Sequence, residues 1–406
     1  MLGDDKGAIS DLRKAVRLKP SWVQARNILG LAEMRAGRLT SAERHFRAAV
    51  RVGPLNSSAA LNLVGLLARA RRWNDVLSSI ERYWKPGLAP VPLSRFAAEA
   101  CLELENPRGS RDWLEAALEK AEAGNERAAV LNNLGVAYTE LDLPAEALKA
   151  FRRSLDEAAS PTTAANLGIV LLESGETGQS VDWLRGRWKR PDFRSREVGM
   201  ALATALMFAV RHEEAIQVAK ELAERADADD RVLGVLSGLL ADGTQDYLAA
   251  IRYASSGLER WPESVMLKNN LSYALLMAGR HEEAARTLAT IDDSTLDRRQ
   301  RVCVTATRGL LRLWQGDLTE GRRLYAAALE SAGREALRER VKAKRDLECA
   351  RALGRLAGPV PEAIALLRRA SEARAGAEPY ASHARAEMRR LTAGPASQGG
   401  QRAEEP

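Results

Sequence analysis

The chain has 406 residues, of which 46% are hydrophobic but only 5% aromatic, and its Lys and Arg outnumber its Asp and Glu by seven. This length is too great for one compact core. The longest stretch of low polarity, residues 198–210, is too short to cross a bilayer. The sequence has no P-loop, dinucleotide-binding, serine-nucleophile or zinc-protease motif, so it indicates no catalytic residues, no metal site and no cofactor.

Three cysteines, Cys101, Cys303 and Cys349, lie far apart and show no paired spacing. Their odd number and wide separation predict buried, reduced thiols and a cytoplasmic protein. No signal peptide is visible, because Asp4 and Asp5 interrupt any apolar run at the start.

Residues 1–22 predict a single helix. Gly3, Ala8, Leu12, Ala15 and Pro20 follow the pattern of the second half of a helix-turn-helix unit, without its first half. Either a lone helix caps the array, or the natural protein begins upstream. We favour truncation, because an opened stack exposes an apolar face.

Residues 23–373 predict a series of helix pairs. The clearest pairs lie at 23–56, 128–160, 161–194, 196–229, 265–298 and 302–335, and weaker ones at 57–90, 93–124, 231–264 and 344–373. The pair at 231–264 carries an insertion around Asp242. A C-terminal helix is expected over 374–391, and the polar, Gly- and Pro-rich residues 392–406 are expected to be disordered.

One spacing recurs through these pairs. It is clearest in the step of 13 residues from Leu134 to Ala147 and the step of 17 residues from Leu134 to Phe151. The same two steps start again at Leu29, Leu167, Leu202 and Leu271, and most of them reach a small residue and then a larger apolar one. Gly135 and Ala147 are small where two helices must approach, and Phe151 is large where a gap must be filled.

A helix-turn-helix unit that recurs about every 34 residues resembles the tetratricopeptide repeat (TPR) family. The resemblance implies an all-α, right-handed superhelical solenoid of about ten repeats. It further implies a non-enzymatic scaffold that binds a peptide or helix of a partner protein in its concave groove.

The resemblance also points to residues of the groove. Asn62, Asn133, Asn166 and Asn270 stand at one slot of the first helix, where an amide can bond a peptide backbone whatever its side chains. The alternative is that these amides bond neighbouring backbone and hold the repeats together. Met200, Phe208 and Tyr273 are expected to face the groove, or else to pack against the next repeat.

Two further functions stay open at this point. Residues 183–196 interleave arginines with Trp183, Trp188 and Phe193, and residues 298–345 are also basic, which is typical of a nucleic-acid-binding solenoid. A solvated outer face explains both stretches more simply. The chain is alternatively a regulatory fragment of a larger protein. No feature indicates membrane insertion.

Overall fold

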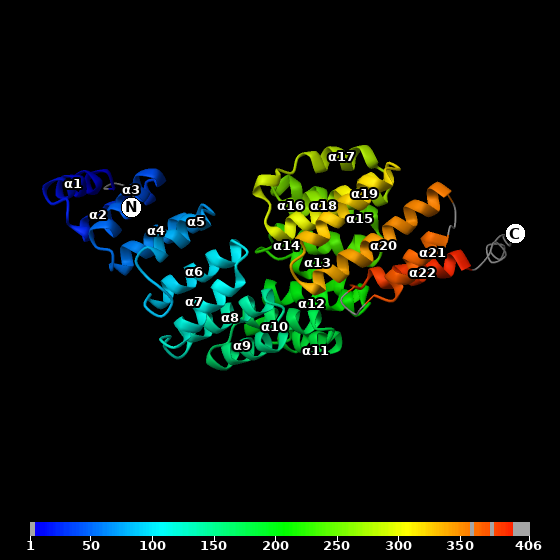
Figure 1. Cartoon of the computed structure of the whole chain (residues 1–406), viewed down its shortest axis with the longest axis horizontal. Coiled ribbons are helices and arrows are strands. Elements are labelled where there is room, and N and C mark those ends of the chain that lie inside the picture. The colour runs from blue at the N-terminus through cyan, green and yellow to red at the C-terminus, as the bar shows by residue number, and fades with distance from the viewer. Residues whose placement is uncertain (1–4, 358–360, 374–376, 393–406) are drawn as a thin grey trace. The chain divides into compact units, whose positions relative to one another are not determined.

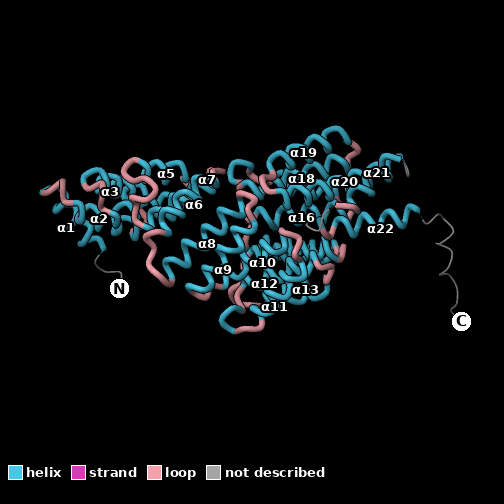
Figure 2. Tube along the Cα trace, turned by 60° about the horizontal axis from the view of Figure 1, so that its bottom comes forward, coloured by secondary structure: helices cyan, strands magenta, loops and turns pink. Residues whose placement is uncertain are grey.

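The computed structural model describes residues 5–357, 361–373 and 377–392, and within these ranges every regular element is a helix (Figures 1 and 2). The chain divides into two compact units, residues 1–159 and 160–406, which we call the N-terminal and the C-terminal unit. The predicted disordered tail lies outside the described residues apart from Thr392.

The N-terminal unit contains nine α-helices in its described part. They are α1 (Asp5–Leu18), α2 (Val23–Arg35), α3 (Leu39–Val52), α4 (Ser57–Arg69), α5 (Trp73–Glu81), α6 (Val91–Glu103), α7 (Pro107–Leu118), α8 (Asn125–Glu140) and α9 (Pro144–Glu157). Beginning with α2, each even-numbered helix packs on the odd-numbered helix that follows it. The helix α1 precedes the first pair and packs on α2.

The C-terminal unit continues the same pattern. Its α-helices are α10 (Pro161–Glu173), α11 (Thr177–Trp188), α12 (Arg196–Phe208), α13 (His212–Ala223), α14 (Asp230–Gly238), α15 (Tyr247–Arg260), α16 (Val265–Met277), α17 (His281–Ala289), α18 (Arg298–Trp314), α19 (Leu318–Ser331), α20 (Glu335–Ala357), α21 (Pro361–Ser371) and α22 (Tyr380–Thr392). Short helical turns η1 (Pro191–Phe193), η2 (Leu239–Gly243) and η3 (Asp293–Thr295) join some of them. The described chain therefore holds ten helix pairs, and the fold is an all-α solenoid of the predicted kind.

The backbone repeats more regularly than the sequence does. Nine residues that follow the first helix of a pair have positive φ: Gly37, Arg71, Glu105, Asp142, Gly175, Val210, Gln245, Gly279 and Gly316. One such residue occurs in each successive pair from α2–α3 to α18–α19, also where the sequence pattern is weak. Only four of these nine turn residues are glycine, the residue that adopts this conformation without steric cost. The turn therefore keeps its positive φ even in the repeats where another residue stands in place of glycine.

Val210 gives a test of this strain. A β-branched residue in the left-handed region is costly, and Val210 is about half exposed, so it gains little from burial. We expect Val210→Gly to raise the free energy of unfolding by about 0.5–1 kcal/mol, the relief of strain exceeding the entropy that glycine adds to the unfolded chain. Denaturant unfolding checks this; a less stable variant would show that Val210 makes contacts that matter.

Three of the pairs, α2–α3, α8–α9 and α10–α11, contain a glycine where their two helices approach closely. A Cβ placed on Gly30 would lie 2.5 Å from the ring of Phe46, and one on Gly135 would lie 2.5 Å from the ring of Phe151. Gly168 stands in the same relation to Leu184. These are the small and large residues that the recurring sequence spacing predicts.

A buried carboxylate fastens α1 to the first pair. Glu33 of α2 is fully buried and accepts hydrogen bonds from Arg13 of α1, at 2.7 Å, and from Arg38 before α3. Burial by itself would raise the pKa of Glu33, but the two arginines outweigh it and hold that pKa below its ordinary value of 4.5. The carboxylate therefore stays ionised at neutral pH.

This cluster predicts a pH-dependent contribution to stability. A lowered pKa in the folded state contributes stability above pH 4.5, which is lost as the pH falls through the folded value. We expect Glu33→Gln to lower the free energy of unfolding by about 1–2 kcal/mol at pH 7, because charge-assisted bonds are lost. The difference from wild type should shrink towards zero at pH 3. Thermal unfolding at both pH values checks this, and an equal difference at both would contradict it.

The structure corrects one expectation and explains another. Cys101 and Cys349 are buried as predicted, but Cys303 is exposed, because it faces outward on α18 between Val302 and Val304, which point into the core. The insertion near Asp242 forms η2, a π-helical turn that follows α14. Such a turn inserts an extra residue into a helix and re-aims the side chains beside it.

Candidate peptide-binding surfaces

In the N-terminal unit the first helices of successive pairs are neighbours: α2 contacts α4, α4 contacts α6, and α6 contacts α8. The amide of Asn62 on α4 donates to Oδ1 of Asn27 on α2 at 2.8 Å. Both side chains are half-buried. This bond ties two repeats together, and it leaves the Oδ1 of Asn62 and the amide hydrogens of Asn27 available to a ligand.

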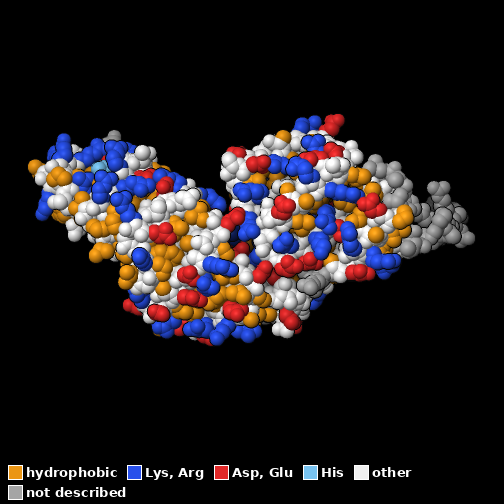
Figure 3. Space-filling view, viewed as in Figure 1, with side chains coloured by type: hydrophobic (Ala, Val, Ile, Leu, Met, Phe, Trp, Pro, Cys, Tyr) orange, Lys and Arg blue, Asp and Glu red, His pale blue; other side chains and the backbone are white. Residues whose placement is uncertain are grey.

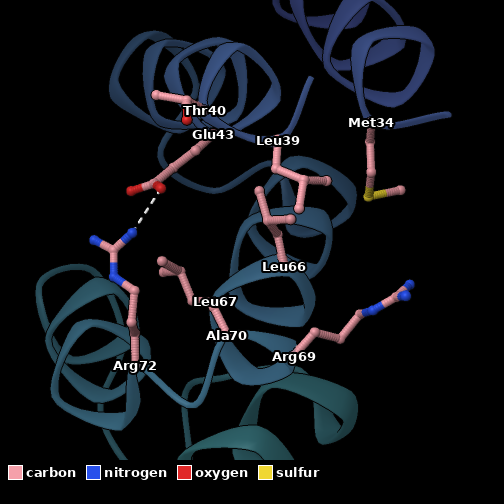
Figure 4. A pocket seen from close by; sticks show the side chains of 9 residues that line it. All are labelled: Met34, Leu39, Thr40, Glu43, Leu66, Leu67, Arg69, Ala70 and Arg72. Atoms are coloured by element: carbon pink, nitrogen blue, oxygen red, sulfur yellow. Dashed lines mark hydrogen bonds and ion pairs between the residues drawn. The ribbon is translucent and has the colours of Figure 1, made fainter. Parts of the chain in front are cut away.

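A pocket of about 450 Å³ lies where these two repeats meet (Figure 4). It is lined by Met34, Leu39, Thr40, Glu43, Leu66, Leu67, Arg69, Ala70 and Arg72. Leu39 is 54% exposed, so the pocket offers apolar surface to solvent. An apolar side chain of a partner would find a site of suitable size here.

The amide pair and the pocket share one face. Asn27 and Met34 stand seven residues apart on α2, and Asn62 and Arg69 stand seven residues apart on α4. Two helical turns bring such residues onto nearly the same side, about 10 Å apart along the axis. An extended chain covers that distance with about three residues.

The two arginines of the pocket differ in their partners, because Arg72, but not Arg69, is paired with a carboxylate among the described residues. Arg72 bonds Glu43 at 2.7 Å, and Glu43 also accepts from Arg47 at 2.8 Å. Burial alone would raise the pKa of Glu43, but these bonds hold it below the ordinary value. In Figure 4, Arg69 extends on the side of Met34, away from the bonded pair, and no carboxylate of the described chain pairs with it. Arg69 is thus a free cation beside an apolar pocket.

The surrounding surface is basic. Residues 1–90 hold 16 Lys and Arg but only 7 Asp and Glu, a net charge of +9 in a chain whose total is +7. Figure 3 shows Lys and Arg side chains gathered over α1 to α5 on the face in view. Sequence reasoning missed this segment, because its arginines are spread one per turn and form no run. Arg35 and Arg69, one repeat length apart at the ends of α2 and α4, were the available signal.

The other predicted asparagines occupy varied surroundings. In the N-terminal unit, Asn133 on α8 is half-buried and accepts a hydrogen bond of 3.3 Å from its neighbour Asn132. In the C-terminal unit, Asn166 on α10 is also half-buried. Asn270 on α16 donates to the backbone oxygen of Gly234 at 2.8 Å and is held against α14. Asn270 therefore bonds a neighbouring repeat, the alternative arrangement that the sequence allowed.

The predicted apolar groove residues of the C-terminal unit lie on α12 and α16. Met200 is half-buried, whereas Phe208 and Tyr273 are only 4% and 7% exposed. The guanidinium of Arg340 on α20 lies 4.4 Å from the ring centroid of Phe208, and Nζ of Lys344 lies 3.7 Å from that of Tyr273. In this conformation the chain's own α20 covers both rings.

Several arginines of the basic stretch 183–196 lie against its own aromatic rings. Arg187 stacks on Trp183 at 3.5 Å, Arg190 on Phe193 at 4.8 Å, and Arg194 on Trp188 at 5.3 Å. Arg190 and Arg194 also pair with Asp192 and Glu221. Aromatic faces covered in this way are not open for bases to stack on.

Many cations of the stretch 298–345 are paired as well. The ion pairs are Arg308 with Asp293, Arg322 with Glu362, Arg323 with Glu320, Lys342 with Glu339, and Arg345 with Asp346. In the described ranges, no three His, Cys, Asp or Glu side chains come together as metal ligands. None of the helices described combines the length and the apolarity that crossing a membrane requires.

Comparison with known families finds the tetratricopeptide repeat. Its family model matches residues 2–51, 29–75 and 235–294. The first two matches overlap the α1–α5 region that holds the amide pair and the pocket. Among curated proteins none matches the chain.

Several solved structures are similar to this chain in fold at low sequence identity. Human IFIT1, solved as a dimer with m7Gppp-AAAA, is 13% identical, with 97% of this chain and 95% of that chain covered and a TM-score of 0.50. Yeast Tom70 is 14% identical, and the match covers 97% of this chain and 88% of Tom70, with a TM-score of 0.44. A tetratricopeptide repeat protein of Parabacteroides merdae is 15% identical, and the match covers 62% of this chain and 96% of that protein, with a TM-score of 0.46. Such identities concern the fold alone.

Proposed function

We propose that this chain, whose residues 2–75 and 235–294 match the tetratricopeptide repeat model, is a non-enzymatic interaction scaffold and that the first helices of its N-terminal unit bind an extended, acidic segment of another protein. The observation that carries this proposal is the shared face of α2 and α4. On that face a polar amide pair, an apolar pocket and an unpaired arginine lie within about three residues' reach of an extended chain.

The binding mechanism follows from these three parts. The free groups of Asn27 and Asn62 bond one peptide unit, which fixes the path of the backbone without reading its side chains. The pocket then takes an apolar side chain, and Arg69 pairs with an acidic neighbour. The helices are already in place, so the main entropic cost of binding is ordering the partner's chain.

The partner's acidity is supported by the charge of the whole segment. The excess of +9 over residues 1–90 attracts an acidic chain from a distance and accelerates its association. Such attraction is screened by salt. A groove-bound peptide that also uses an apolar pocket keeps part of its affinity at high salt, whereas a ligand held by phosphate contacts loses it steeply.

Selection of peptides on the full chain tests the proposal. A library of random dodecapeptides displayed on phage should yield sequences with an apolar residue next to Asp or Glu. We expect Asn62→Ala to lower the affinity for a selected peptide about five- to tenfold, as measured by fluorescence anisotropy, because one hydrogen bond is lost. The melting temperature should barely change, because water can replace the bond to the half-buried Asn27.

Asn74→Ala is the matched control. Asn74 is exposed on α5, a second helix, and its loss should leave peptide affinity unchanged. Two outcomes contradict the proposal: selected peptides that bind Asn62→Ala as well as wild type, and a library that yields no enriched sequence. A single-stranded oligonucleotide that displaces the peptide at high salt would instead favour nucleic acid, the ligand class present in the human IFIT1 structure.

A further inference from the structure

We call the surface of the C-terminal unit that carries Phe208, Asp242 and Tyr273 its inner face. This face is covered by α20 and α22, helices from the end of the same chain. The hydroxyl of Tyr380, at the start of α22, donates to Oδ2 of Asp242 in η2 at 2.9 Å, across 138 residues of sequence. His383, one turn further along α22, makes a hydrogen bond with the backbone of Gly243. The extra residue of the π-helical turn thus places Asp242 where α22 docks.

Lys344 of α20 lies in the middle of this contact. Its Nζ is 3.7 Å from Oδ1 of Asp242, 3.7 Å from the ring centroid of Tyr273 and 5.1 Å from that of Tyr380. Burial by itself would lower the pKa of Lys344, but Asp242 keeps it above its ordinary value. Asp242, Tyr273 and Lys344 therefore form a charged and aromatic contact surface on the inner face, which we call the seat.

The helix α22 contributes a stripe of small residues to this seat. Tyr380, Ala381 and Ala384 are between 0 and 6% exposed and stand three or four residues or one residue apart, on one side of α22. Ala377, which precedes the helix, is fully buried as well. Apart from the tyrosine, this stripe buries only methyl groups, so it provides little apolar area to hold the helix in place.

The seat is also imperfectly satisfied. Buried polar atoms without a hydrogen-bond partner in the described structure gather around it: Nδ1 of His212, Nε of Arg340 and Oε2 of Glu348. Oδ1 of Asp242 has its ion pair with Lys344 but no hydrogen bond within the described residues. Buried groups of this kind are costly and are normally paired. A helix that supplied donors and acceptors to these atoms would bind the seat better than α22 does.

We propose that the inner face of the C-terminal unit is a second, helix-binding site, which α22 occupies in the isolated chain and from which a partner helix displaces it. The partner helix carries the same features as α22, namely a tyrosine followed by small residues at three- and four-residue steps, together with polar groups for the unpaired atoms. Displacement uncovers Asp242 and Lys344, which Tyr380 contacts in the isolated chain. This site is independent of the peptide site on α2 and α4.

The test uses the full chain and a fluorescein-labelled peptide of residues 377–392. In Ala384→Glu a charge replaces a fully buried methyl group, so α22 should leave the seat. We expect the amides of α22 to exchange at least about tenfold faster in hydrogen–deuterium exchange, while α16 and α20 keep their protection. The peptide should then bind this variant at least about tenfold more tightly than wild type, because the seat is empty.

Ala386→Glu is the control, because Ala386 is exposed on the same helix. It should match wild type in both measurements. The proposal is overturned if α16 and α20 lose protection together with α22, which would make α22 an integral part of the fold. It is equally overturned if α22 is released and the peptide binds no more tightly.

A milder variant keeps the test informative should Ala384→Glu unfold. Tyr380→Phe removes only the hydroxyl that bonds Asp242 and should speed exchange of the α22 amides about tenfold. Unchanged exchange would show that this bond does not hold α22. Binding of library peptides at the N-terminal unit should be the same in every variant, so failure here is distinguishable from failure of the first site.

Discussion

Replacement of Gly135 by leucine is expected to lower the free energy of unfolding of the N-terminal unit by about 3 kcal/mol. Even a single added Cβ would lie 2.5–2.7 Å from three ring atoms of Phe151, closer than non-bonded carbons approach. Phe151 is 1% exposed and cannot swing into solvent. The two helices α8 and α9 must therefore separate, and the contacts along their length are lost. Thermal and denaturant unfolding of the full chain measure the loss.

Gly186→Leu is the control for helix propensity. Gly186 lies in α11 with nothing within 4 Å of a Cβ placed on it. The same substitution should there be neutral or stabilising by up to about 1 kcal/mol, since leucine is the better helix former. Equal effects at the two positions would show that the close contact at Gly135 is wrongly placed.

A compensating change isolates the contact itself. A Cβ on Gly168 would lie 2.5 Å from Leu184, so leucine at the slot that Phe151 fills also requires a facing glycine. We therefore expect Phe151→Ala, which removes the ring, to recover part of the loss in Gly135→Ala, so that the double variant is more stable than the sum of the two single effects predicts.

Charge reversal at Arg69 is expected to weaken peptide binding about 30-fold, or by about 2 kcal/mol. Glutamate in this place would repel the acidic residue of the ligand and leave Glu43, already bonded to Arg72, as a second negative charge in the pocket. A selected peptide with its acidic residue changed to lysine should regain affinity for Arg69→Glu. Anisotropy titrations at low and high salt measure both effects.

Arg44→Glu provides the matching control. Arg44 is exposed on α3 and does not line the pocket, so its reversal changes the net charge by the same amount. It should lower the association rate modestly and leave dissociation unchanged. If Arg44→Glu and Arg69→Glu weaken binding equally, the pocket is not the site and only the overall charge attracts the ligand.

Several features follow from the sequence alone. The recurring steps from Leu134 to Ala147 and Phe151 predict the helix pairs, because a small residue facing a large one is what two close helices require. The sequence also predicts half a repeat over residues 1–22 and a C-terminal helix over 374–391. These are local properties, and adjacent repeats contact mainly their neighbours, so sequence spacing suffices to find them.

The tertiary structure decided what the repeats expose. The sequence places Phe208 and Tyr273 on the first-helix face, but only the structure shows that α20 covers both rings. Asp242 reads as an insertion, and only the fold brings it to Tyr380, because 138 residues separate the two. The pocket beside Arg69 likewise needs two repeats to be placed together. The physical reason is that spacing fixes which face a residue occupies, whereas the path of the whole chain determines what lies against that face.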